Sequence, residues 1–204
     1  MSDTGLRSAS YRFGDHDVDV LTTGVGMIAT AAWSSRAFAA EHYDLALNVG
    51  LCGSFDASLA ASAVVHVTAD RVAELGAEDG DEFLTIFQLQ LVGENEFPFD
   101  GGLLVNTNPP PLKPLATLRS VTGITVNTVH GNERTIAAVR ERYHPDVESM
   151  EGAAFMYASL IAGVPFAQVR AVSNMVERRN RGAWKIDEAI RALGDQAVRL
   201  LESA

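Results

Sequence analysis

The sequence predicts an α/β protein, with one mixed β-sheet flanked by helices on both faces. Short apolar runs that end at turn residues indicate strands, and amphipathic or alanine-rich stretches between them indicate helices. The length of 204 residues suits one hydrophobic core and is marginal for two. Hydrophobic residues make up 47% of the chain and charged residues 21%, as in ordinary globular proteins. We therefore expect a single domain over residues 1–204.

The apolar runs are the expected strands, and most of them end at glycine, aspartate or asparagine. They cover residues 17–24, 45–50, 63–70, 123–129 and 166–174. The last of the expected helices has a regular amphipathic spacing. The helices are expected at residues 27–41, 132–142, 151–162 and 187–202. Their alternation with the strands places helices on both sides of the sheet.

The stretch 92–114 interrupts this alternation, because it is rich in proline and glycine. A loop of this length inside a compact domain is usually functional or disordered. Phe97 and Phe99 flank Pro98 within it, and two phenyl rings are poorly placed in water. We expect the stretch to form a lid or a subunit contact.

Charge and composition exclude several classes of partner. The formal net charge of −10 argues against nucleic acid or an anionic membrane, since both attract clustered cations. The segment 177–185 does hold three arginines, which we interpret as solvated surface, with an anionic ligand or a partner subunit as the alternative. No apolar run is long enough to cross a bilayer, and residues 1–10 lack the order of a secretion signal. A cytoplasmic location is therefore expected.

Cysteine and histidine usage argues against metal or redox chemistry. Cys52 is the single cysteine, which excludes an internal disulfide and a cysteine-based metal cluster. The histidines lack the spacing of a metal site. We expect no metal and no cofactor. His130 alone stands at the end of a predicted strand, so it is a candidate site residue.

Two predicted strand ends are rich in glycine, and α/β sheets bind ligands beyond such ends. The first runs through Gly24 and Gly26 into a helix, whose free amides suit an anion or a sugar hydroxyl. A tight structural turn explains it equally well. The second places Cys52 just before Gly53, where backbone can approach a ligand. We interpret the thiol as buried and inert, because no basic group adjoins it in the sequence.

The third strand end, in the predicted strand 166–174, carries a charged side chain and an amide side chain. Arg170 interrupts an apolar strand, and Asn174 ends it. A buried arginine needs a carboxylate, and Glu148 and Glu151 are the candidates. A structural ion pair, with an asparagine that turns the chain, is the alternative to a ligand site.

These segments together resemble the superfamily of purine nucleosidases and phosphorylases that includes methylthioadenosine nucleosidase. The resemblance runs in the family's order from residue 24 to residue 174, and "VESMEGAA" followed by "VRAVSN" is its specific part. "LGAEDGDEF" (75–83) and "EFPF" (96–99) point to the futalosine-hydrolysing branch. The other segments that carry it are "GVGMIATA", "NVGLCGSFD", "DRVAELGAEDGDEF" and "NTVHGNE".

The resemblance implies a nucleoside phosphorylase-like fold and a nucleoside N-ribohydrolase that releases hypoxanthine from futalosine, in menaquinone biosynthesis. Its partners would be the nucleoside and water, with no nucleic acid or membrane, in a homodimer or higher homo-oligomer. Phosphate needs cationic clamps, and the glycine-rich segments 24–30 and 48–54 contain no arginine. Water is therefore the expected nucleophile.

The resemblance also assigns roles to residues at the third strand end. Glu151 would accept hydrogen bonds from the 2′ and 3′ hydroxyls of the ribose, with Met150 along the sugar. Arg170 would orient that carboxylate or the nucleophile, and Ser173 would position Asn174. The Asn174 amide cannot give up a proton, but it can accept from N7–H and donate to a 6-oxo group. The expected substrate-binding set also includes Gly24, Gly26, Gly53, Cys52, His130 and Phe97.

The chain departs from the family pattern at its start. Family members usually begin with a strand that ends in a water-activating glutamate, and residues 1–20 offer no substitute. We expect the fold to lack that first strand, and general-base help is worth ~100- to 10,000-fold. A non-catalytic protein that binds 6-oxopurine nucleosides is therefore one alternative. A purine nucleoside phosphorylase is the other, if Arg36 or Arg71 reaches the pocket.

Overall fold

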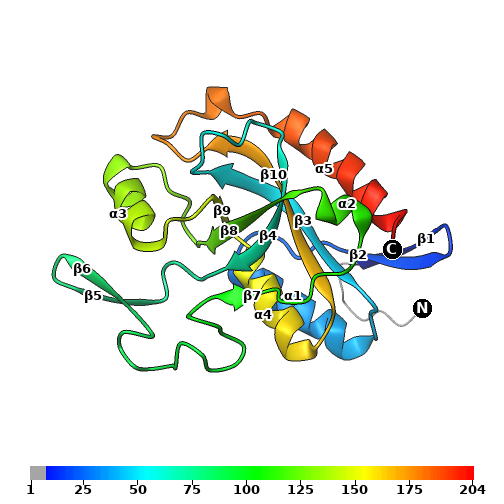
Figure 1. The fold of residues 1–204 in the computed structure, drawn as a ribbon, viewed down its shortest axis with the longest axis horizontal. Coiled ribbons are helices and arrows are strands. Elements are labelled where there is room, and N and C mark those ends of the chain that lie inside the picture. The colour runs from blue at the N-terminus through cyan, green and yellow to red at the C-terminus, as the bar shows by residue number, and fades with distance from the viewer. Residues whose placement is uncertain (1–7) are drawn as a thin grey trace.

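The first described element of the chain is a hairpin that is separate from the central sheet (Figure 1). The computed structural model describes residues 8–204, so most of the segment examined for a secretion signal lies outside it. Strands β1 (Ser8–Phe13) and β2 (His16–Leu21) pair with each other in antiparallel register. The expectation of a buried strand at 17–24 is wrong, because β2 ends at Leu21 and most of the hairpin is exposed.

The central sheet is mixed, as predicted, but it closes on itself. Its order is β10-β3-β9-β8-β4-β7, and β10 also pairs with β4. In the ring that β10, β3, β9, β8 and β4 complete, β9 pairs with β3 and β4 pairs with β10 in antiparallel register, and the other pairings are parallel. The strands are β3 (Ala46–Ser54), β4 (Val64–Asp70), β7 (Leu104–Val105), β8 (Arg119–Thr125), β9 (Val147–Ser149) and β10 (Phe166–Met175).

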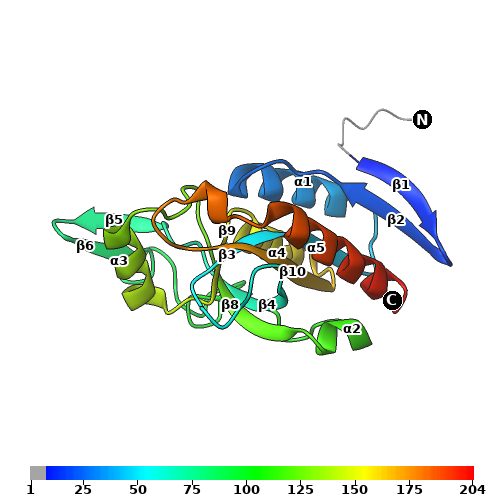
Figure 2. The same ribbon diagram turned by 90° about the horizontal axis from the view of Figure 1, so that it is seen from above.

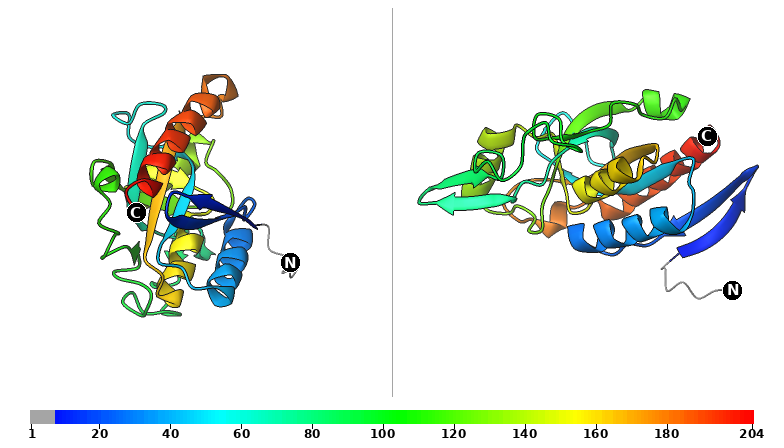
Figure 3. Two further views of the ribbon diagram at one scale, coloured as in Figure 1. Left: turned by 90° about the vertical axis from the view of Figure 1, so that its right-hand side faces the viewer. Right: turned by 90° about the horizontal axis from the view of Figure 1, so that it is seen from below.

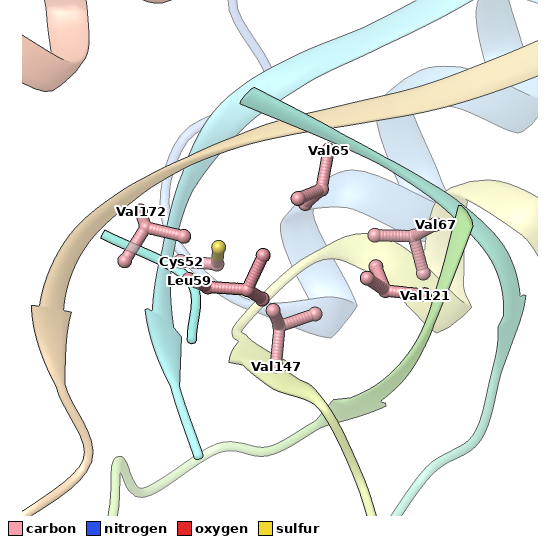
Figure 4. Packing of buried hydrophobic residues seen from close by; sticks show 7 residues of the cluster. All are labelled: Cys52, Leu59, Val65, Val67, Val121, Val147 and Val172. Carbon is pink, nitrogen blue, oxygen red and sulfur yellow. The ribbon is translucent and has the colours of Figure 1, made fainter. Parts of the chain in front are cut away.

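Apolar side chains fill part of the space that the ring encloses. Figure 4 shows them pointing toward one another from the strands around the ring. The buried cluster consists of Cys52, Leu59, Val65, Val67, Val121, Val147 and Val172. A packed interior of this kind holds no ligand, so a binding site must lie at the rim where the strands end.

Helices flank the closed sheet on two sides, in line with the predicted α/β arrangement. Helices α1 (Met27–Ala40) and α4 (Gly152–Ala162) pack side by side on one face (Figure 3). Helix α5 (Ile186–Leu201) packs on β10, β3 and β4 from the other, next to the one-turn α2 (Lys113–Ala116). All four predicted helices lie within one residue of their expected bounds.

The end of the molecule opposite the β1–β2 hairpin carries α3 (Glu133–Tyr143) and a second hairpin, β5 (Gly76–Asp79) and β6 (Glu82–Thr85) (Figure 2). The strand expected at 123–129 is displaced, since β8 already ends at Thr125. The chain bends there because the Glu74 carboxylate accepts hydrogen bonds from the backbone N–H groups of Asn127 and Thr128.

The stretch 92–114 is less irregular than predicted, because β7 lies within it and α2 begins at its end. Phe99 anchors the loop, with its ring 5.2 Å from that of Phe87 and 5.9 Å from that of Tyr157. Phe97 remains 71% exposed. Among residues 8–204, no helix is long and apolar enough to span a membrane.

A buried carboxyl group supports the start of α4. Asp70 accepts hydrogen bonds from the Gln168 amide at 2.9 Å and from the Thr125 hydroxyl at 3.0 Å. Thr125 Oγ1 in turn accepts from the backbone N–H of Ala153, in the first turn of the helix. Burial raises the pKa of Asp70 to about 6, and these hydrogen bonds only partly oppose it.

This raised pKa predicts a pH-dependent stability. An unfolded aspartic acid loses its proton near pH 4, whereas the folded protein keeps that proton up to about pH 6. Asp70 therefore contributes most to the free energy of unfolding at low pH. That contribution falls by ~3 kcal/mol in all as the pH rises from the unfolded pKa through the folded pKa of about 6. The variant Asp70→Asn should gain about 1 to 2 kcal/mol on wild type between about pH 5 and about pH 8.

Urea denaturation of both proteins at the two pH values measures this gain. The exposed Asp44→Asn variant is the control, because its difference from wild type should stay constant. A difference that is the same at both pH values for Asp70→Asn would mean that the carboxyl group ionises normally in the fold.

Candidate active site

Glu151 directly precedes α4, but it does not cap the helix. Its side chain makes no hydrogen bond to the first turn. Instead, Oε1 accepts a hydrogen bond from the backbone N–H of Gly26 at 3.1 Å, and Oε2 lies 3.5 Å from Nη1 of Arg170. The carboxylate thus bridges the start of α1 and strand β10. Since its side chain is 20% exposed, a ligand can reach it.

Arg170 is enclosed beneath this carboxylate, with its side chain 2% exposed. Nη2 donates to Oδ1 of Asn48 on the neighbouring strand β3. Burial lowers the pKa of Arg170 and the charge of Glu151 opposes that effect, but a guanidinium stays protonated in any case. The sequence left Glu148 and Glu151 open as partners of this arginine, and Glu151 is the one in contact.

Glycine at position 50 makes room for the guanidinium. A Cβ atom there would lie 2.1 Å from Nη1 of Arg170. Gly152, by contrast, leaves no space for a ligand, because its Cβ would meet Asp70 at 2.3 Å and Gln168 at 2.5 Å. Gly152 therefore leaves space for the buried side chains of Asp70 and Gln168 and not for a ligand.

A second group of polar side chains surrounds a small pocket at the rim. Asn174 lies at the end of β10, where Oδ1 accepts from the Ser173 hydroxyl at 2.8 Å and Nδ2 donates to the Met175 carbonyl at 2.8 Å. One N–H and one lone pair of the amide remain for a ligand. The strand register places Asn174 beside Gly53, so two of the predicted residues meet there.

His130 and Glu148 line the same pocket as a contacting pair. His130 Nδ1 contacts Oε2 of Glu148, and the backbone N–H of His130 donates to Oε1 at 2.9 Å. Both side chains are largely enclosed, at 14% and 3% exposure. Glu148 pairs with Gly53 across β9 and β3, which places the carboxylate on the opposite side of that glycine from Asn174.

The remaining predicted residues stand further from these contacts. The Cys52 thiol lies in the core, where burial raises its pKa to about 12 although the nearby charge of Arg170 opposes this, and its backbone carbonyl accepts from the Ser173 hydroxyl. This agrees with an inert thiol and not with a ligand-binding one. Gly24 is exposed, Met150 is half-buried, and no contact between Phe97 and Glu151 or Asn174 is present within residues 8–204.

The segment 177–185 contributes residues that the sequence analysis assigned to solvated surface. Arg179 and Trp184 line the pocket of Asn174, and the guanidinium carbon lies 5.7 Å from the indole centroid. A hydrogen bond of 2.8 Å from Lys185 N–H to the Ser173 carbonyl ties the segment to β10. Arg179 is exposed, as predicted, although it also lines the pocket, whereas Trp184 is half-buried. The tryptophan that follows the end of the predicted strand 166–174 could have indicated this contribution from the sequence.

The fold and the site together define an α/β enzyme that handles a small polar molecule. The Glu151 carboxylate is partly exposed at the start of α4, and the Asn174 amide and the His130 imidazole line a small polar pocket at the end of β10. The chain belongs to the phosphorylase superfamily, whose family model matches residues 4–204.

Two comparisons with individual proteins support this membership. The chain is 35% identical to a futalosine hydrolase of Streptomyces coelicolor, over 89% of this chain and 77% of that protein. It is 34% identical to a futalosine hydrolase of Thermus thermophilus, over 89% and 80%. Its fold is similar to that of a methylthioadenosine/S-adenosylhomocysteine nucleosidase of Campylobacter jejuni, with a TM-score of 0.78, 17% identity and coverage of 100% and 89%.

The space at Gly50 yields a testable prediction. Gly50→Ala should push the enclosed guanidinium of Arg170 away from Glu151 and Asn48, at a cost of about 1 to 3 kcal/mol in unfolding free energy. Gly194→Ala is the matched control, because a Cβ there meets nothing within 4 Å and alanine favours the interior of α5. Thermal melts should show a lower Tm for the first variant and a higher one for the second; equal effects would remove the steric argument.

Proposed function

We propose that this chain hydrolyses the N-glycosidic bond of futalosine and releases hypoxanthine, as a nucleoside N-ribohydrolase of menaquinone biosynthesis. The observation that carries the proposal is the identity of 34–36% to three futalosine hydrolases, each aligned over 86–89% of this chain. A solved futalosine hydrolase mutant of Helicobacter pylori has the same fold, with a TM-score of 0.77 at 14% identity over 100% of this chain and 86% of that one.

The Glu151 side of the site suits a ribose. Gly26 N–H binds Oε1 and Arg170 lies beside Oε2, so the orientation of the carboxylate is fixed. A carboxylate in a fixed orientation can accept hydrogen bonds from two adjacent hydroxyls. The same negative charge stabilises the positive charge that grows on the sugar as the base departs. In this role Arg170 acts on the substrate through Glu151, because it is buried beneath it.

The Asn174 side suits a 6-oxopurine. Its free N–H can donate to the 6-oxo group and its free lone pair can accept from N7–H, whereas a 6-amino group would leave the amide donor unmatched. Ser173 fixes which end of the amide faces outward, because its hydroxyl donates to Oδ1. Trp184 adds an aromatic face to the same pocket.

Arg179 lines the Asn174 pocket and packs on Trp184, but the two arginines that were considered for a phosphorylase lie elsewhere, which favours water as the nucleophile. Arg71 lies with its guanidinium carbon 4.8 Å from the ring centroid of Tyr143, and Arg36 lies over Trp33 at 5.6 Å. Neither is among the residues that line the Asn174 pocket in the described part of the chain. The glycine-rich segments offer backbone amides but no guanidinium.

Hypoxanthine release from futalosine, measured with and without added phosphate, tests the proposal. We expect release at the same rate in both conditions, with free ribosyl product and no sugar phosphate. Dependence on phosphate would favour the phosphorylase, and futalosine binding without any release would favour the non-catalytic nucleoside-binding protein.

Removing the charge of Glu151 tests the ribose contact. Glu151→Gln keeps the size of the side chain but loses the acceptor strength of the carboxylate, so futalosine affinity and kcat should both fall, each by about 10-fold or more. Glu41→Gln, at an exposed position after α1, is the control and should change neither. A thermal melt of each variant separates this effect from loss of the fold, and unchanged kinetics would rule out the assigned role.

An acid at position 174 tests base recognition. Asn174→Asp should shift the ratio of kcat/KM for adenosine to that for inosine toward adenosine by at least ~10-fold, because the new carboxyl group accepts from a 6-amino group. Asn180→Asp places the same charge at the same pocket and serves as the control. An unaltered ratio in Asn174→Asp would show that the amide does not read the base.

We also propose a cytoplasmic homodimer or higher homo-oligomer. Large apolar side chains are exposed on α1, on α4 and in the loop before β7, and such side chains often contact another chain when they gather on one surface. They include Val25 and Ile28 at the start of α1, Phe97, and Tyr157 and Ile161 on α4. Sedimentation equilibrium measures the assembly, and a monomer at micromolar concentration would contradict it.

A further inference from the structure

The pair formed by His130 and Glu148 has no assigned role in the reaction beyond substrate contact. Its geometry is that of an oriented imidazole. The Glu148 carboxylate accepts a hydrogen bond from the backbone N–H of His130 and contacts the ring nitrogen Nδ1, so the orientation of the ring is fixed through Nδ1. No hydrogen bond to the other nitrogen, Nε2, is present among residues 8–204, and the residue lines the pocket beside Asn174.

Cleavage of a purine nucleoside creates a need that Asn174 cannot meet. When the bond between C1′ and N9 breaks, its electron pair stays on the purine, which then departs as an anion unless a proton reaches it. An amide donates hydrogen bonds but does not release a proton at neutral pH. The base pocket therefore needs a separate source of that proton, and an acid placed there is typically worth ~100- to 10,000-fold.

The charged groups that face this pocket differ in their ability to supply it. Arg179 keeps its proton under all ordinary conditions, and Glu177 lies on the exposed stretch after β10. Glu148 is committed to His130 through both oxygens. Histidine changes its protonation between about pH 5 and pH 8, and an anionic partner at Nδ1 stabilises the charged ring. His130 is thus the group with both a suitable proton and a free nitrogen.

We propose, on the basis of the futalosine hydrolase function above, that His130 is the general acid for the leaving base and that Glu148 is its positioning residue. The proton on Nε2 moves to a nitrogen of the departing purine as the C1′–N9 electron pair collapses onto the ring. Neutral hypoxanthine leaves, and the oxygen of water bonds to C1′. The proton that this water loses goes to solvent, and solvent returns one to His130.

The strand register explains how the pair reaches the base. Glu148 and Asn174 flank Gly53, one across β9 and the other across β10, and a Cβ atom at Gly53 would lie 2.8 Å from Val176 and 3.3 Å from Nδ2 of Asn174. Asn174 and His130 line the same pocket, so a purine that the amide holds there also meets the imidazole. One side recognises the base and the other protonates it, which separates specificity from proton transfer.

Two leaving groups distinguish proton donation from a structural role. His130→Ala should lower kcat for futalosine by ~100-fold or more with little change in KM, because the purine needs the proton. The same variant should cleave 4-nitrophenyl β-D-riboside within about 3-fold of wild type, since 4-nitrophenolate departs without protonation. His42→Ala, at an exposed position, is the matched control and should alter neither substrate.

The pH dependence of kcat for futalosine is the second measurement, and it stands even if the nitrophenyl riboside is a poor substrate. Wild-type kcat should fall as the pH rises and the imidazolium loses its proton, and this fall should be absent from His130→Ala. Glu148→Gln should lower kcat for futalosine more than for the nitrophenyl riboside, because the imidazole loses the carboxylate that orients it. A fall produced by Glu177 or by the substrate would instead survive in His130→Ala.

Equal losses on both leaving groups, or a fall in kcat that persists without His130, would overturn the inference. A wild-type protein that releases no hypoxanthine from futalosine contradicts the proposed function itself. A wild type that releases hypoxanthine, together with a His130→Ala variant that is equally fast, contradicts this inference alone.

Discussion

The ion pair between Glu151 and Arg170 is the interaction on which the site depends. It joins α1, α4, β3 and β10, because Glu151 also receives Gly26 N–H and Arg170 also donates to Asn48. Breaking such a pair by removing one partner costs about 3–5 kcal/mol, because the other charge stays buried. The enclosed arginine therefore fixes where the carboxylate stands, and the exposed part of that carboxylate is free to serve a ligand.

The start of α4 shows how the core supports this arrangement. Asp70 and Gln168 occupy the space beside Gly152, and Thr125 connects Asp70 to the first turn of the helix. This network directly follows Glu151 in the chain, so it holds the residue before the helix in place. The cost is a carboxyl group whose charge is disfavoured in the core. A fold built this way trades some stability at neutral pH for a fixed site.

The helices could be predicted from local sequence patterns, but the pairing of the strands could not. The helices were predicted to within a residue, because amphipathic spacing and alanine-rich composition are local features. The structure shows in addition that Asn132 caps α3 by accepting a hydrogen bond from the backbone N–H of Arg134. The short strand β9 and the closure of β10 onto β4 were missed, since pairing depends on strands far apart in the sequence. The β1–β2 hairpin pairs locally, and its error was different: the apolar residues of β2 were expected to be buried, but no residue of that strand is buried.

The sequence by itself determined the fold class, the family and the residues available for chemistry, because glycine-rich strand ends and the run from Glu148 to Gly152 are local features. Only the tertiary structure decided which carboxylate meets which cation. Glu148 and Glu151 are three positions apart, yet one contacts His130 and the other Arg170. Their partners come from different strands and loops, and such pairings are set by how the chain closes its sheet. Local sequence spacing cannot encode that choice.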